Sequence, residues 1–391
     1  MKKMLFCAAA AIAALASCSK TQVVYNDAPE EIAFKQITGA MTKATDGYEA
    51  LDGSISLGVY AYHTPVSGDY DSYFANVAFA KDGDAWAANP AEYYPLSGTL
   101  DFVGYAPYIP SGVTYTLSKT GAVSGEDGTI TETLGTLTIY NFDNTDNNCE
   151  LVTEEQVVDA GEGEEEGEGA PKVQRDLLYS DYIAGVGKKT GLQLMNLNHA
   201  LAKIGVSVTL QGTGSLTIES LVLKNTYQTG QLNVTYSSET KEIAKQDDVT
   251  ATSETVTTYI GTPGWSSGLT NTTTWPTYNY SIIFEESDKT LSLSSEDTKT
   301  VNSKEFYVIP GYQTTMELKY KLGDYTTVIT HTFNLSSSSA NIQWKAGNKY
   351  TYNITINNYE IKFDAKVAPW TNNTYSTEVD YANNTTTPVE E

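Results

Sequence analysis

The feature that most constrains the fold is a series of short stretches in which apolar and polar residues alternate, separated by Gly, Ser, Asn and Thr. The first stretch, residues 31–37, places Ile32 and Phe34 on one face, and a richer one follows at 55–62. Alternation with a period of two is typical of β-strands that bury one face. Such stretches recur as far as residue 370, and long helical periodicities are nearly absent. The sequence therefore predicts an all-β protein built of sandwiches or barrels.

The second half of the chain continues this pattern. Leu192 and Leu194 mark one expected strand, and an alternation of Ile and Val over residues 204–208 marks the next. The stretch between them, residues 196–203, is interpreted as a short helical turn. The sequence contains no repeat with a period of about 20 to 50 residues, so a propeller or a solenoid is not expected.

The N-terminus has the plan of an export signal. Lys2 and Lys3 precede an apolar run over residues 5–16, which is shorter than the roughly 20 residues needed to span a bilayer. The run leads into Leu-Ala-Ser-Cys, which resembles a bacterial lipobox, where the cysteine receives a diacylglycerol and the signal is cut just before it. We predict a signal peptide over residues 1–17 and lipid attachment at Cys18. An ordinary signal peptide with an incidental cysteine is the alternative.

Cysteine and charge usage narrow the function further. After loss of Cys7 with the signal, Cys149 is the only cysteine besides the lipidated one, so no intrachain disulfide framework is expected. The chain has 48 acidic and 24 basic residues, a net charge of −24, which repels nucleic acid and keeps an exported protein soluble.

Residues 154–170 alternate Gly and Glu and should be solvated. They lack the ligand spacing and fixed Gly of a calcium loop, so a metal site there is not favoured.

The residue types needed for catalysis are not grouped in the sequence. His63, His199 and His331 lie far apart without metal-ligand spacing, and His199, flanked by apolar residues, is interpreted as a packing residue. No nucleophile elbow, phosphate-binding loop or dinucleotide fingerprint is present. We therefore predict neither an active site nor a cofactor. The abundant tyrosines and tryptophans are compatible with a sugar-stacking surface, but also with ordinary exposed sheets.

Four separated stretches, at residues 31–62, 86–110, 176–208 and 344–370, carry a family likeness. The second ends in an aromatic pattern, the third contains His-Ala-Leu-Ala-Lys-Ile, and the fourth ends in a tryptophan. The residues that form the aromatic pattern and the final position are Phe102, Tyr105, Ala106, Pro107 and Trp370. In this order the four stretches resemble the fimbrillins of Bacteroidales, including the Mfa-like fimbrillins. The Gly-Glu stretch has no counterpart in that pattern.

The resemblance implies a fold of two transthyretin-like β-sandwich domains in tandem. On this basis residues 44–190 form the N-terminal domain and residues 191–370 the C-terminal domain. Residues 18–43 would be a propeptide, and residues 371–391 a C-terminal tail. The implied function is that of a structural, adhesive pilin subunit without catalytic activity.

The resemblance also implies a maturation step. A strand carrying Ile32 and Phe34 would plug a groove in the N-terminal domain until a trypsin-like protease cuts the chain between Lys43 and Ala44. The family commonly has Arg at the cleavage position, whereas this chain offers Lys43 and Lys35. Lys43 is preferred because Lys35 lies inside the plugging strand.

The C-terminal tail is the candidate donor strand. Tyr375, Thr377, Val379 and Tyr381 fall on one face of an alternating stretch, and such a strand from one subunit would fill the opened groove of another. A disordered polar tail is the alternative. The expected partners are other pilin subunits, the protease, the outer membrane before cleavage, and a host glycan or protein receptor.

Two other functions remain open at this point. A surface glycan-binding lipoprotein that does not polymerise would use the same signal and the same aromatic sheets. An outer-membrane hydrolase would need a catalytic site that the sequence does not indicate. The pilin hypothesis predicts an outer-membrane lipoprotein precursor that becomes part of a cell-surface fimbria.

Overall fold

The computed structural model describes residues 29–37, 55–83, 85–125, 129–144, 176–188, 192–247, 250–267, 277–311, 315–337, 340–341, 343–357, 361–369, 379–380 and 385–386. Within these ranges the chain is composed of strands, with a single turn of 3-10 helix at Glu286–Asp288. In the described part of the chain no helix is long and apolar enough to cross a membrane. The prediction of an all-β protein is confirmed.

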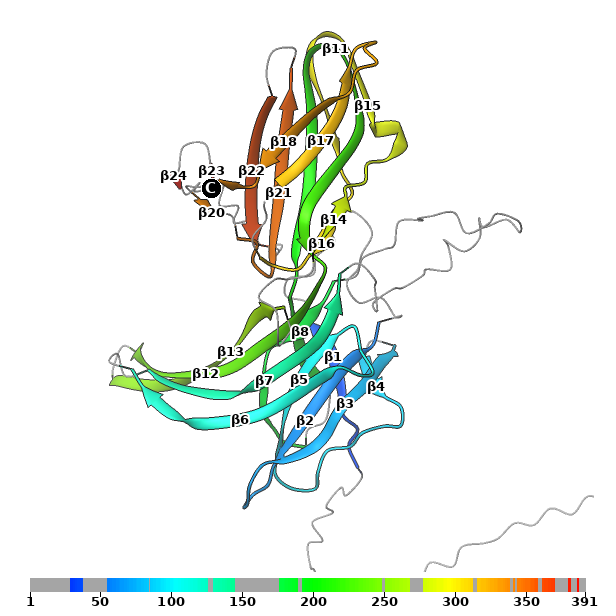
Figure 1. Cartoon of the computed structure of the whole chain (residues 1–391). Helices are drawn as coiled ribbons and strands as arrows, with labels where there is room; N and C mark the ends of the chain where they lie inside the picture. Colours follow the sequence, from blue (N-terminus) through cyan, green and yellow to red (C-terminus); the bar gives the residue numbers. More distant parts are fainter. Residues whose placement is uncertain are drawn as a thin grey trace, which may run out of the picture.

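The first sheet closes into a barrel of seven strands, blue to green in the lower part of Figure 1. In order around the barrel these are β2 (Leu57–Thr64), β3 (Asp71–Asp82), β4 (Ala85–Ala88), β1 (Ala33–Ile37), β10 (Gln193–His199), β8 (Leu178–Ser180) and β5 (Thr99–Ala106). The barrel is closed because β5 pairs again with β2, and β9 (Ile183–Val186) pairs with β5. Side chains from all seven strands fill its interior.

A curled four-stranded sheet packs against the outside of the barrel. Its order is β13 (Thr250–Ser266), β12 (Thr229–Asp247), β7 (Ile130–Asp143) and β6 (Val113–Ser124). The buried side chains between sheet and barrel include Val103 and Tyr105 of β5 and Leu137 and Tyr236 of the sheet. β5 is therefore buried on both faces, which explains why its sequence is almost continuously apolar.

The third sheet forms a curled half-barrel in the upper part of Figure 1. Its main order is β18 (Ile329–Asn334), β17 (Thr315–Leu322), β11 (Ala202–Tyr227), β21 (Asn348–Ile356) and β22 (Ile361–Pro369), and β14 (Thr277–Ser281), β15 (Thr290–Asn302) and β16 (Phe306–Val308) also pair with β11. The rings of Phe333 on β18 and Phe363 on β22 stack 4.7 Å apart, so the two ends of the sheet curl toward each other. Two short pairs complete the fold, β19 (Ser336–Ser337) with β20 (Ala340–Asn341), and β23 (Val379–Asp380) with β24 (Thr385–Thr386).

β11 connects the half-barrel to the lower sheets at both of its ends. Two residues separate its start from β10 of the barrel, and one residue separates its end from β12 of the curled sheet. Between these ends the strand passes Gly212 and Gly214, whose φ angles of 101° and 125° are positive. Such angles favour glycine, which has no Cβ to clash with the backbone.

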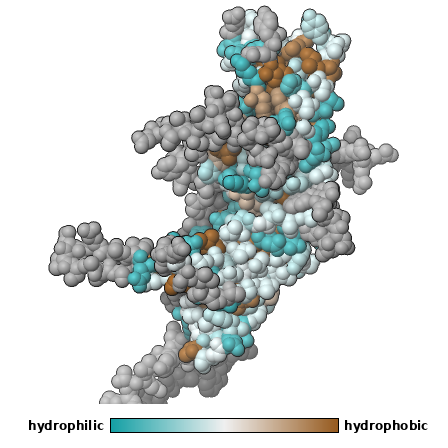
Figure 2. Space-filling view, turned by 60° about the vertical axis from the view of Figure 1, so that its left-hand side comes forward, coloured by the Kyte–Doolittle hydropathy of each residue, from teal (hydrophilic) through white to brown (hydrophobic). Residues whose placement is uncertain are grey.

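The surface offers little continuous apolar area on the side drawn in Figure 2. The described atoms there are mostly white and teal, and brown is limited to small areas, the most continuous near the top of the half-barrel. Exposed apolar residues at the connection between β17 and β18 are Tyr325, Val328 and Ile329.

Near residue 195 the predicted helical turn is wrong, whereas the predicted strand is present. The interval predicted as a helical turn, 196–203, contains the end of β10 and the start of β11. β10 itself is present, but Leu192 and Leu194 are 42% and 51% exposed, and Met195 and Leu197 face the barrel interior instead. In a strand, a shift of one residue exchanges the two faces.

Residue 190 does not separate the sheets. β10, which follows it in the sequence, lies in the barrel beside β1. β12, which also follows it, pairs with β7 in the curled sheet along most of its length. The lower part of the molecule is therefore built from segments on both sides of the predicted boundary between residues 44–190 and 191–370.

Candidate functional site: the strand that closes the barrel

β1 is a five-residue strand held on both sides. It runs antiparallel to β4, with Phe34 opposite Trp86, and parallel to β10, with Phe34 opposite Gln193. Just before β1, the Ile32 amide donates to the Glu92 carbonyl at 2.7 Å. In the described structure β4 and β10 have no ladder with each other. Closure of the barrel at this point therefore depends on β1.

The side chains of Ile32 and Phe34 point into the barrel and are fully buried, as their alternation predicts. The ring of Phe34 meets those of Phe79 and Phe102 edge-on, with centroids 5.1 and 5.3 Å apart. Edge-to-face contacts of this kind add to the stabilisation that comes from burial alone. Without these two side chains the barrel interior would open onto an apolar groove between two unpaired strand edges.

The surroundings of β1 include one perturbed tyrosine. The amide of Tyr94 donates to the Glu30 carbonyl at 2.9 Å, directly before β1. Burial, and then the nearby Glu30 carboxylate, raise the pKa of Tyr94 to about 12. The phenol of Tyr94 is therefore neutral at physiological pH, and its side chain packs in the apolar interior of the barrel.

The structure describes only part of the predicted site. Lys35 lies within β1, and its side chain is exposed while its backbone pairs with Leu194. Val379 begins the short strand β23 and pairs with Thr386 of β24. The other predicted positions lie outside the described residues. These are Cys18, Lys43, Ala44, Cys149, residues 154–170, Tyr375, Thr377 and Tyr381.

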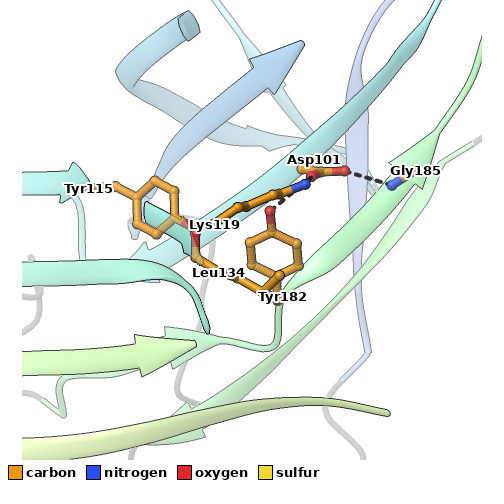
Figure 3. Close-up of polar contacts among 6 residues, drawn as sticks. All are labelled: Asp101, Tyr115, Lys119, Leu134, Tyr182 and Gly185. Atoms are coloured by element: carbon orange, nitrogen blue, oxygen red, sulfur yellow. Dashed lines mark hydrogen bonds and ion pairs between the residues drawn. The ribbon is translucent and has the colours of Figure 1, made fainter. Parts of the chain in front are cut away.

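A polar cluster that was not predicted from the sequence joins the curled sheet to the barrel. Asp101, on barrel strand β5, is 5% exposed. Its carboxylate accepts hydrogen bonds from the Tyr182 hydroxyl at 2.8 Å and the Gly185 amide at 2.7 Å, and it pairs with Lys119 of β6 at 2.9 Å (Figure 3). A single acidic residue within the apolar run of β5 was the available sequence signal, because buried carboxylates need partners.

Within this cluster the pKa values of Lys119 and Tyr182 are both raised. Burial alone would lower the pKa of Lys119, but hydrogen bonds with Tyr70 and Asp101 outweigh it and raise that pKa. Burial and the charge of Asp101 raise the pKa of Tyr182 far above its ordinary value. Lys119 is thus a cation, and its ammonium also lies 3.8 Å from the centre of the Tyr70 ring. The arrangement is an ion pair with satisfied hydrogen bonds, and it joins two sheets.

The histidines do not form a catalytic or metal centre in the described part of the chain. His199 is buried, as expected of a packing residue, but it also contacts the carboxylate of Asp176. His63 interacts with the Ser97 carbonyl at 2.8 Å, and the ring of His331 lies against Phe333. Among the described residues no group of three or more His, Cys, Asp or Glu could hold a metal ion.

Comparison with known proteins identifies the family. The sequence profile of the fimbrillin-like family matches residues 42–370, well over half of the chain. The chain belongs to the fimbrillin-like family. Fimbrillins are structural proteins, so the predictions of a fimbrillin and of a protein that is not an enzyme are confirmed. Membership identifies a fimbrial, cell-adhesion protein of the Bacteroidales type, which belongs to a cell-surface fimbria assembled from such subunits.

Solved structures of fimbrial proteins from Bacteroides and Porphyromonas align with most of this chain. A fimbrial protein from Bacteroides vulgatus is 16% identical, and the match covers 87% of this chain and 99% of that one with a TM-score of 0.49. The tip fimbrial protein Mfa3 from Porphyromonas gingivalis, with a C-terminal truncation, is 9% identical, and the match covers 88% and 100% with a TM-score of 0.39. Among curated proteins none matches this fimbrillin-like sequence significantly.

Proposed function

We propose that this fimbrillin-like protein is a pilin subunit that is exported as an outer-membrane lipoprotein and polymerises by donor-strand exchange. In this proposal the barrel with its curled sheet and the half-barrel correspond to the two transthyretin-like β-sandwich domains. β1 fills the barrel in the precursor, and a trypsin-like protease removes it by cutting between Lys43 and Ala44. A strand from a second subunit then takes its place beside β4 and β10.

The observation that carries the proposal is the pairing of β1. A strand of five residues closes the barrel, and the side chains of Phe34 within it and of Ile32 directly before it are fully buried. Full burial of such side chains is worth roughly 1.5 to 3 kcal/mol each. While β1 is covalently attached, its high effective concentration favours it over any free donor. Cleavage would remove that advantage and leave a groove with two free edges, to which a donor strand can add.

The pairing of β1 also favours Lys43 over Lys35 as the cleavage position. Lys35 lies in the ladder with β10, where its backbone is engaged. Proteolysis concentrates at exposed chain segments with few backbone hydrogen bonds. Lys43 follows the strand in a Gly- and Thr-containing stretch, residues 38–48. A cut there releases β1 as one piece.

The C-terminal tail contains a sequence that matches the plug. Glu-Ile-Ala-Phe, residues 31–34, has a counterpart in Glu-Val-Asp-Tyr, residues 378–381. In this alignment Val379 takes the position of Ile32, and Tyr381 that of Phe34. The donor proposed from Tyr375, Thr377, Val379 and Tyr381 therefore presents a β-branched residue and an aromatic residue with the same spacing as β1.

Processing in cells tests the proposal. Lys43→Gln should leave full-length protein attached to the membrane and abolish polymer ladders, measured by N-terminal sequencing and gel electrophoresis of unheated samples. Lys35→Gln is the matched control and should be processed normally. Normal polymer with an unchanged N-terminus in the Lys43→Gln strain would contradict the cleavage site. Cys18→Ala should abolish incorporation of labelled fatty acid, and persistent labelling would contradict the lipid site.

The donor is tested separately. Val379→Asp and Tyr381→Asp place a charge where the groove is apolar, so they should give protein that is cleaved but remains monomeric. Thr385→Asp, in the same tail but outside the matching residues, is the control. Polymer formation by the Val379→Asp and Tyr381→Asp variants would exclude this tail as the donor.

A further inference from the structure

Two connections at one end of the barrel carry the most exposed large apolar side chains of the described structure. Val66, between β2 and β3, is 84% exposed, and Leu96, between β4 and β5, is 87% exposed. Tyr73 and Tyr93, which lie at the same end, are 37% and 43% exposed. These four residues are called the barrel tip below. In Figure 1 the β2–β3 connection lies at the lower end of the barrel, away from the half-barrel.

Hydrogen bonds hold the two connections of the barrel tip together. The His63 ring, at the end of β2, interacts with the Ser97 carbonyl at 2.8 Å. The Tyr73 hydroxyl, at the start of β3, donates to the Tyr93 carbonyl at 2.7 Å. The β2–β3 and β4–β5 connections therefore present their apolar side chains as one surface, rather than as two independent loops.

The chain enters the barrel at this same end. The Ile32 amide donates to the Glu92 carbonyl at 2.7 Å, and Glu31 forms an antiparallel bridge with Tyr93. The segment that leads into β1 therefore runs beside the β4–β5 connection of the barrel tip.

The proposed lipid is attached close to this entry point. Ten residues, 19–28, separate Cys18 from Pro29, where the described structure begins. A fully extended chain of that length spans at most about 40 Å, and a flexible one averages about 20 Å between its ends. A lipid on Cys18 would thus hold this end of the barrel, rather than the half-barrel, close to the membrane surface.

We propose that the barrel tip of the lipid-anchored precursor rests on the membrane, with Val66 and Leu96 inserted into the interfacial region of the bilayer. This inference rests on the lipid attachment at Cys18 that belongs to the proposed function. Tyrosine is enriched in the interfacial region, because its ring is apolar and its hydroxyl is polar. Tyr73 and Tyr93 therefore suit the positions beside the two aliphatic side chains.

Acidic residues near the barrel tip limit the depth of the contact. Asp69 lies in the β2–β3 connection, Asp71 begins β3, and Glu92 lies in the β4–β5 connection. Carboxylates are costly to place in hydrocarbon, so these three groups keep the barrel itself in water. Only the aliphatic side chains at the tip enter the bilayer, and the lipid on Cys18 supplies most of the attachment. The contact orients the precursor more than it anchors it.

This orientation keeps the proposed cleavage segment away from the membrane. β1 leads away from the barrel tip, because it runs antiparallel to β4, which ends there. The chain returns at Ile55, whose carbonyl accepts a hydrogen bond from the Trp86 indole of β4 at 3.3 Å. Residues 38–54, which contain Lys43, therefore leave and rejoin the described structure at the opposite end of the barrel. A soluble protease reaches that end without approaching the bilayer.

Fluorescence quenching from the bilayer tests the contact. The lipid-bearing protein, with Cys149→Ser, carries an environment-sensitive fluorophore at Ser67→Cys, an exposed position beside Val66. The protein is reconstituted in phosphatidylcholine vesicles whose acyl chains carry a nitroxide quencher. The probe should be quenched at least about threefold more than the same probe at Tyr325→Cys, in the half-barrel. Equal quenching at the two positions would overturn the proposal.

A double substitution separates the contact from the lipid anchor. Burial of one aliphatic side chain contributes roughly tenfold to a partition equilibrium. Val66→Ser combined with Leu96→Ser should therefore reduce quenching of the Ser67→Cys probe at least about threefold. Both side chains are highly exposed, so the fold is retained. Tyr325→Ser combined with Val328→Ser, which removes exposed apolar side chains from the half-barrel, is the matched control and should leave the quenching unchanged.

Incorporation of labelled fatty acid at Cys18 is measured on every variant, so that the two proposals fail separately. Unchanged quenching in the Val66→Ser, Leu96→Ser protein with fatty acid present would overturn the membrane contact and leave the lipid attachment standing. Absence of fatty acid from the unsubstituted Cys18 would contradict the proposed function, and this inference with it. Shielding of the Ser67→Cys probe that grows with protein concentration in the absence of vesicles would assign the barrel tip to a second copy and overturn the proposal.

Discussion

Replacing Phe34 with alanine removes the largest side chain that holds β1 in the barrel. The side chain is fully buried, and its ring meets Phe79 and Phe102 edge-on. Truncation of a buried phenylalanine costs about 3 to 5 kcal/mol, because both transfer free energy and packing around the new cavity are lost. Within that total, each edge-to-face pair accounts for about 0.5 to 1.5 kcal/mol. We expect most of the loss to fall on the attachment of β1, since the rest of the barrel retains its own contacts.

Hydrogen exchange of the full-length chain measures this loss where it occurs. A change of 3 kcal/mol corresponds to more than about a hundredfold in an equilibrium constant. Amides of β10 that face β1 should therefore lose at least that much protection in Phe34→Ala, while β21 in the half-barrel should keep its exchange rate. Leu194→Ala, on β10 but 51% exposed, is the control and should change stability by no more than about 0.5 kcal/mol. Equal protection of β10 in both variants would refute the idea that Phe34 anchors β1.

Three further predictions concern stability. Hydrogen bonds from Lys203 and Lys349 overcome the effect of burial and lower the pKa of the Glu305 carboxyl from its ordinary value of 4.5. The stability that this carboxylate contributes to the fold is therefore present above pH 4.5 and is lost as the pH falls through the lowered pKa. Glu305→Gln should cost about 1 to 3 kcal/mol at pH 7 in urea unfolding, with a smaller difference in acid. Lys119→Met leaves Asp101 without its cation and should cost about 1 to 3 kcal/mol, and a value near zero would contradict the fastening role. Deleting residues 154–170 should move the thermal midpoint by only a few degrees in calorimetry, and a large drop would show that the segment is structural.

The strand at the site was predictable because its signal is local. Ile32 and Phe34 alternate with polar residues, and that pattern alone gives a strand with one buried face. Its neighbours were not predictable in the same way. Trp86 and Gln193, which lie opposite Phe34, are far from it in the sequence. Their register depends on closure of the whole barrel, which no short stretch encodes.

The failures have equally specific reasons. In β10 the apolar residues Leu194 and Met195 are adjacent, so alternation alone could not decide which face is buried. β13 was missed because threonine and glycine replace the aliphatic residues that mark a strand. Asp101 was overlooked because its partners come from two other strands and a loop, which the sequence does not bring together. Most strands could therefore be predicted from the sequence, whereas their register and their tertiary pairing could not.

The attachment of the half-barrel at one end has a mechanical consequence. β11 leaves the barrel beside the start of β21, with Lys203 opposite Lys349, and Lys349 lies opposite Ala368 at the end of β22. The chain therefore exits β22 two strand spacings, about 10 Å, from where it entered. If neighbouring subunits hold the barrel and the tail by the proposed strand exchange, tension between them would cross only the base of the half-barrel. The rest of the half-barrel, out to residues 323–328, would then bear little load, so its length and sequence could change without weakening the filament.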